Sequence, residues 1–220
     1  MLQAFHNEKE VKDKYVNRVI AHRKADNIIQ GTGWEEGKGC AVGCTLERYT
    51  HESYPIELGI PEWLAHLEDT LFEGMEQKDA MVWPENFLKA IPLGVTEGQF
   101  DKNVKRPFMI FILEGLFHNF DIEEYPEIAA VIKDVIALHK RGDVTNDEWR
   151  SARSAAASAA ASASAASAAS ASAASAASAS SWSASASAAS AASAVSITAR
   201  TEAYKQYADK LIELLEQARG

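Results

Sequence analysis

The chain has 220 residues and a formal net charge of −9, with two cysteines and six histidines. The acidic balance excludes a protein that binds nucleic-acid phosphates, because such a protein needs a basic patch. The longest apolar run, residues 108–117, is too short to span a bilayer, and the first residues lack the apolar core of a signal peptide. We therefore expect a soluble cytoplasmic protein that binds neither nucleic acid nor membrane, with cysteines that are free, metal-bound or reactive rather than paired.

The first 75 residues predict two helices separated by a long loop. Polar residues 7–10 favour a helix start, and an apolar stripe continues to about Gln30, where Gly31 favours a stop. Residues 31–61 are glycine-rich and predict an irregular loop, and Pro61 suits the first position of a helix over 61–75. The apolar face of that second helix comprises Trp63, Leu64, Leu67, Leu71 and Met75.

Further helices are predicted over 84–91, 107–120, 126–140 and 198–218, each from an apolar stripe or a nearly continuous apolar run. Patterns typical of strands are poor throughout the chain. The sequence therefore predicts an all-α protein whose N-terminal module contains an irregular Gly/Cys loop.

Residues 151–196 consist of 25 alanines and 18 serines, interrupted by Arg153, Trp182 and Val195. Alanine is the best helix former, and neither glycine nor proline interrupts the tract. The preceding residues 145–148 (TNDE) form a helix start with acids in the first turn. We expect a long helix or a helical hairpin; disorder, or a flat Ala/Ser surface that binds a partner, are the alternatives.

These patterns divide the chain into three segments. Residues 1–145 form a helical module that carries the candidate site, and 146–197 form the Ala/Ser-rich arm. Residues 198–220 form an amphipathic helix that packs back on the body. The arm could also support an oligomer.

Two polar residues interrupt the apolar stripe of the first predicted helix. His22 and Asp26 are spaced i,i+4, so both lie on that stripe, where an aspartate is rare unless it is paired. They are expected to form a hydrogen-bonded core pair, to lie at a partly exposed edge of the stripe, or to belong to a functional site.

The loop places Cys40 and Cys44 among five glycines. Glycines permit close backbone approach, so Lys38 and Gly39, with Trp34 as a pocket wall, are candidate ligand- or anion-binding residues. The loop lacks the spacing of a phosphate-binding loop, and Cys-x3-Cys is not a standard zinc spacing. The alternatives that remain are a structural loop, a reactive thiol and a metal site.

A metal site here would combine Cys40 and Cys44 with His22, His51 or His66, and zinc is one ion that such ligands bind. On the helix predicted over 61–75, residues 62, 66, 69 and 73 (Glu, His, Asp and Glu) share a polar face. That face is expected to be solvated, with a cleft-lining surface as the alternative.

Three functions compete. The leading hypothesis is a helical module that binds a small molecule, a metal ion or a protein partner. The second is a cysteine hydrolase with Cys40 or Cys44 as nucleophile, His22 or His66 as base and Asp26 as orienting group. The third is a structural or interaction protein that acts through the Ala/Ser arm.

Four segments, AFHN (4–7), AHRKAD (21–26), GKGCAVGCT (37–45) and LGIPEWLAHLEDTLFEGM (58–75), carry a resemblance. They resemble an uncharacterised family of bacterial and phage-borne proteins with an Ala-rich C-terminal repeat. The similarity covers roughly residues 1–90 and implies that these segments form one unit, in a phage–host setting. Repeats in such proteins often carry Tyr, Trp, Asp or Arg among the alanines, whereas serine occupies nearly all those places here.

Overall fold

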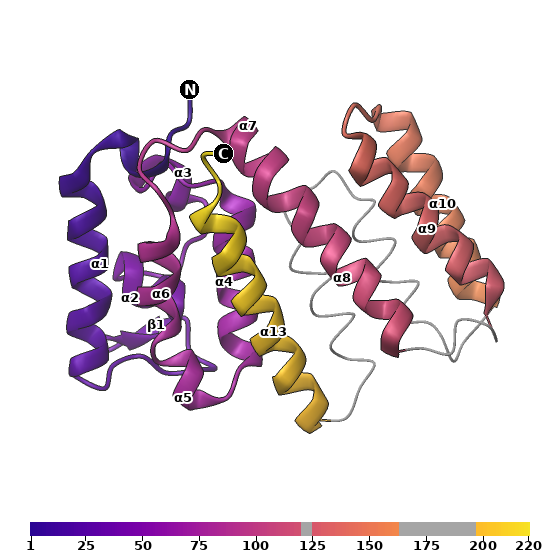
Figure 1. Ribbon diagram of the computed structural model, residues 1–220. Helices are drawn as coiled ribbons and strands as arrows, with labels where there is room; N and C mark the ends of the chain where they lie inside the picture. Colours follow the sequence, from indigo (N-terminus) through magenta and orange to yellow (C-terminus); the bar gives the residue numbers. More distant parts are fainter. Residues whose placement is uncertain (120–124, 163–196) are drawn as a thin grey trace. The chain divides into compact units, whose positions relative to one another are not determined.

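The computed structural model describes residues 1–119, 125–162 and 197–220, and these ranges are built almost wholly from helices (Figure 1). The predicted all-α class is confirmed. The chain divides into two compact units, one of Met1–Val104 with Tyr204–Gly220 and one of Lys105–Ala203. Among the helices in the described ranges, none is long and apolar enough to cross a membrane.

The first unit contains most of the elements, and its centre is helix α4. In chain order the elements are η1 (Ala4–Asn7), α1 (Lys9–Lys24), β1 (Trp34–Glu35), β2 (Lys38–Gly39), α2 (Ala41–Leu46), α3 (Ser53–Glu57), α4 (Glu62–Gly74), α5 (Gln77–Ala80), α6 (Trp83–Ala90), α7 (Glu97–Gln99) and the π-helical turn η2 (Phe100–Lys105). Helices α2, α3 and α6 all pack against α4. The predicted apolar face of α4 is buried from Trp63 to Met75.

The C-terminal part of α13 (Ile197–Glu216) also belongs to this unit and lies beside α4 (Figure 1). The Tyr204 ring covers Gly74 so closely that a Cβ built there would lie 2.3 Å from it. At the other end, the Asn103 amide donates to the carbonyls of Ala218 and Gly220, both at 2.9 Å. These contacts hold the chain terminus on the first unit.

Helix α1 ends six residues earlier than the sequence predicts, at Lys24 instead of Gln30. Asp26 adopts a left-handed conformation (φ 53°), and the Asn27 amide donates to the His22 carbonyl at 3.0 Å. This is a Schellman arrangement, which caps the last carbonyls of a helix. Because an aspartate occupies the position that glycine usually takes, the sequence pattern did not reveal the stop.

The predicted loop 31–61 contains more regular structure than expected. Strands β1 and β2 pair antiparallel, and Glu36 and Gly37 between them both have positive φ (48° and 81°), as a two-residue hairpin turn requires. Two short helices, α2 and α3, follow the hairpin. Segments this short give no periodic signal in the sequence.

The loop glycines serve close packing. A Cβ built on Gly43 would lie 1.8 Å from the Gly33 carbonyl oxygen, and one on Gly39 would lie 2.3 Å from the same atom. A Cβ on Gly33 would lie 2.5 Å from the Tyr49 ring. The absence of side chains therefore lets the hairpin lie directly on α2.

The second unit contains α8 (Arg106–Asn119), α9 (Pro126–Arg141) and α10 (Asn146–Ser162), and α9 packs against both of the others. The helix start predicted at 145–148 is confirmed: the Thr145 amide donates to the Glu148 carboxylate (2.8 Å), and the Glu148 amide donates to the Thr145 hydroxyl (3.3 Å). Residues 163–196 of the Ala/Ser tract lie outside the described residues, so the alternatives for that tract stay predictions.

Gly43→Ala should lower the free energy of unfolding by about 1–3 kcal/mol or more, because the new methyl group collides with a backbone carbonyl. Gly98→Ala is the matched control, since no described atom lies within 4 Å of a Cβ built there. Urea unfolding followed by tryptophan fluorescence measures both. Equal stabilities for the two variants would contradict the packing role of Gly43.

Hydrogen bonds from the Thr145 backbone and from Arg141 lower the pKa of Glu148 to about 2. A depressed carboxyl pKa stabilises the fold above the usual value of 4.5, and the contribution is lost as the pH falls through about 2. Carbon NMR titration of Glu148 should therefore give a midpoint near 2, which moves upward in Arg141→Gln. Arg150→Gln, which removes the partner of Asp147, should leave that midpoint in place.

Candidate metal centre

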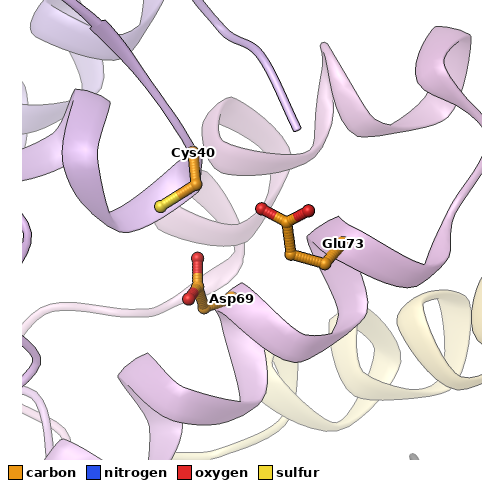
Figure 2. Close-up of side chains that lie close together, drawn as sticks. All are labelled: Cys40, Asp69 and Glu73. Carbon is orange, nitrogen blue, oxygen red and sulfur yellow. The ribbon is translucent and has the colours of Figure 1, made fainter. Parts of the chain in front are cut away.

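Cys40, Asp69 and Glu73 converge at the junction of α2 and α4 (Figure 2). Cys40 is the N-cap of α2, and Asp69 and Glu73 lie one turn apart on α4. The Cys40 Sγ and one carboxylate oxygen from each acid all lie within 4.8 Å of one another. Figure 2 shows one oxygen of Asp69 and one of Glu73 turned toward the space beside the sulfur.

Asp69 is held by one of its two oxygens. Its Oδ2 accepts from the Tyr49 hydroxyl at 2.9 Å and lies 3.3 Å from His51 Nε2, whereas the buried Oδ1 has no hydrogen-bond partner among the described residues. Burial by itself would raise the pKa of Asp69, but the hydrogen bonds from His51, Cys40 and Tyr49 outweigh it and hold the pKa below its usual range. One oxygen of the Asp69 carboxylate, Oδ1, is therefore available to a further ligand.

Backbone amides orient the other two side chains. The Gly31 amide donates to Glu73 Oε2 at 2.8 Å, and the Gly43 amide lies 3.4 Å from the Cys40 sulfur. Partial desolvation raises the pKa of Glu73, and burial together with the Asp69 charge raises the pKa of Cys40. Without a bound cation, Cys40 is a neutral thiol.

The adjacent acid on α4, Glu68, belongs to a separate buried contact. Its carboxyl is completely buried, and its Oε2 accepts from the Tyr54 hydroxyl at 2.5 Å. Burial holds the pKa of Glu68 well above its usual value. The raised pKa favours the neutral form of Glu68, whose other oxygen, Oε1, is also buried without a hydrogen-bond partner among the described residues.

Cys44 does not belong to the three-residue cluster. Its thiol donates to the carbonyls of Gly39 (3.3 Å) and Asn27 (3.6 Å), and burial raises its pKa to about 12. Both cysteines are free and buried. The structure therefore does not place them together as the pair of ligands that the sequence suggested.

His22 and Asp26, the candidate residues on the first helix, also do not belong to the three-residue cluster. The His22 Nε2 lies 3.6 Å from the Glu47 carboxylate, and its ring meets Trp34 edge to face at 5.3 Å. Asp26 is exposed beyond the end of α1. The predicted pairing of His22 with Asp26 depended on a continuous helix, which the Schellman arrangement ends.

Lys38 and Gly39 form β2, where Lys38 is exposed and Gly39 is packed against the backbone of Gly33. Trp34 is half-buried on the neighbouring strand. The hairpin leads directly into Cys40, and ligand binding by these residues stays a prediction.

The polar face predicted on α4 is buried in part: His66 and Asp69 are buried, whereas Glu73 is exposed as a solvated face requires. His66 is 4% exposed and Asp69 is 9% exposed. The His66 Nε2 lies 3.3 Å from Glu62, and its ring stacks on His51 with centroids 4.0 Å apart. Burial and the neighbouring His51 charge lower the pKa of His66.

Sequence analysis identified Cys40 as a ligand and Asp69 and Glu73 as one helix face, but it did not join them, and it did not single out Tyr49. The signal available in the sequence was the i,i+4 spacing of Asp69 and Glu73, which places both acids on one face of the helix. Only the packing of α2 on α4 shows that the thiol completes the group.

Comparisons with protein-family models, with curated proteins and with solved structures found no match to this chain. The function must therefore be argued from the geometry of the cluster.

The native protein should alkylate slowly with iodoacetamide at pH 8, because burial raises the pKa of both thiols. Peptide mass spectrometry should show faster modification of both cysteines after unfolding in urea. Modification of native Cys40 faster than free cysteine would instead support the nucleophile hypothesis.

Proposed function

We propose that the protein is a binding module for a divalent transition-metal ion, held by Cys40, Asp69 and Glu73, with zinc as the preferred ion. The observation that carries the proposal is the buried Oδ1 of Asp69, which lacks a hydrogen-bond partner among the described residues and belongs to a cluster with a thiol and a second carboxylate. An unsatisfied buried acceptor costs about 1–3 kcal/mol, and a cation would offset that cost.

The distances between the three donor atoms would have to shorten for all three to bind one ion. Around a tetrahedral zinc ion, sulfur and oxygen donors lie about 3.5 Å apart, given bond lengths of about 2.3 and 2.0 Å. The separations here are within 4.8 Å, and Glu73 is exposed at the edge of the cluster and able to move inward.

Outer hydrogen bonds support the same conclusion. Metal ligands are usually oriented by a second set of partners, which leave the coordinating atom available. Here Tyr49 and His51 contact Oδ2 of Asp69, and the Gly31 amide holds Oε2 of Glu73. The glycine-rich loop would thus contribute to the site through its backbone.

The thiol determines the class of ion. Calcium and magnesium prefer oxygen ligands alone, whereas a thiolate with carboxylates suits zinc and related transition metals. All three donors lie in GKGCAVGCT and LGIPEWLAHLEDTLFEGM, two of the segments that carry the resemblance to bacterial and phage-borne proteins. Proteins with both segments are expected to have the same donor set.

The cysteine-hydrolase hypothesis has less support. The raised pKa values of both thiols disfavour a thiolate nucleophile, and the orienting residue Asp26 is exposed beyond α1. The hypothesis of an interaction arm concerns mainly residues 163–196, outside the described ranges.

The two cysteines offer a matched test. Elemental mass spectrometry of protein purified without chelator, and of reduced apoprotein titrated with zinc, should give about one equivalent for the wild type and for Cys44→Ser. Cys40→Ser should bind zinc more than about 100-fold more weakly, since loss of a ligand exceeds the effect of losing an outer partner.

Circular dichroism confirms that both variants remain folded, and serine keeps an N-cap at position 40. The proposal fails if the reduced wild type binds no zinc, or if Cys40→Ser binds it as tightly as the wild type.

A further inference from the structure

A set of three anionic donors leaves one position of a tetrahedral ion to be filled. The thiolate and two carboxylates carry a charge of −3 against +2 on the ion, and a neutral fourth donor adds no further negative charge. A neutral donor, either an imidazole or a water molecule, suits the remaining position. An imidazole would close the site, whereas water would leave it open to exchange.

His51 is the imidazole that already contacts the cluster. Its Nε2 lies 3.3 Å from Oδ2 of Asp69, the carboxylate oxygen beside the proposed ligand oxygen Oδ1. The side chain is 12% exposed, so water would compete little for its position. His22, the other histidine that the sequence suggested, contacts Glu47 and Trp34 instead.

Coordination would require the segment that carries His51 to move, and the neighbouring rings limit the direction of that movement. His51 lies in the segment between α2 and α3, outside regular helix. Its ring is backed on one face by His66, at 4.0 Å between centroids and 25° between planes, and meets Tyr49 at its edge. His51 is outside the group of ligand atoms that lie within 4.8 Å of one another, so coordination requires this segment to shift toward the cluster while the Tyr49 hydroxyl continues to hold Oδ2 of Asp69.

We propose that His51 is the fourth ligand of the ion bound by Cys40, Asp69 and Glu73, exchanging its hydrogen bond with Asp69 for coordination. The inference rests on the proposed function and deepens it. The centre is then a closed Cys-Asp-Glu-His site that joins the segment after α2 to α4. It stabilises this part of the fold and keeps no exchangeable position.

The decisive experiment uses the full-length wild-type chain, labelled with ¹⁵N-histidine and titrated with ¹¹³Cd²⁺ as a substitute for zinc. Coordination predicts a scalar coupling between cadmium and one ring nitrogen of His51, assigned by comparison with His51→Gln. In parallel, a Co²⁺ titration should give the near-ultraviolet charge-transfer band of a thiolate ligand, which reports Cys40.

Affinity alone would not decide the question, because a positioning role for His51 through Asp69 would also weaken zinc binding by about 10- to 100-fold. His51→Gln should weaken binding in that range, and His22→Gln, the matched control, should not change it.

The outcomes separate the two proposals. Cadmium coupling to His51 supports the closed site. A thiolate band with no coupling to His51, or with coupling to His66 instead, overturns this inference and leaves the metal-binding function standing. Absence of any thiolate band and of any bound ion overturns both.

Discussion

The burial of ionisable side chains on α4 is the constraint on which the first unit depends. A charged or polar group removed from water must be paired, and α4 carries His66, Glu68 and Asp69 into its packed surroundings. Each acquires a partner from the segment between α2 and α4: His51 stacks on His66, Tyr54 donates to Glu68, and Tyr49 donates to Asp69. The segment between α2 and α4 is therefore placed as much by these polar contacts as by apolar packing.

The two neighbouring acids on α4, Glu68 and Asp69, differ in the direction in which their surroundings shift their pKa values. Glu68 is completely buried, and burial raises its pKa well above the usual value, which favours the neutral form. Asp69, one residue later, has a lowered pKa because several donors reach it, and one oxygen of each acid, Oε1 of Glu68 and Oδ1 of Asp69, is buried without a hydrogen-bond partner among the described residues. The groups packed around two neighbouring acids on one helix thus shift their pKa values in opposite directions. A cation at Asp69 would complete the pairing that the fold leaves unfinished.

The glycine-rich loop supports this arrangement through its backbone. Gly33, Gly39 and Gly43 lie so close together that no side chain fits between them, which allows β2 to deliver Cys40 to the start of α2. The Gly31 amide meets Glu73, and the Gly43 amide meets the Cys40 sulfur. The close packing of the loop therefore accounts for three of its glycines. The missing side chains of its glycines allow close backbone packing, and two of the glycine amides donate hydrogen bonds to Glu73 and Cys40.

The sequence by itself determined the all-helical class, the positions of the longer helices and the apolar face of α4, because each depends on local periodicity and on nearby start signals. It also identified Cys40 and the acidic face of α4 as separate features. Only the tertiary structure decided that Cys40 belongs with Asp69 and Glu73 and not with Cys44, since 29 residues separate Cys40 from Asp69 and no local pattern spans that distance. The end of α1 was likewise decided by a left-handed aspartate and its capping hydrogen bonds, which moved Asp26 out of the predicted site. Local patterns determine elements, whereas the packing of distant segments determines which side chains share a site.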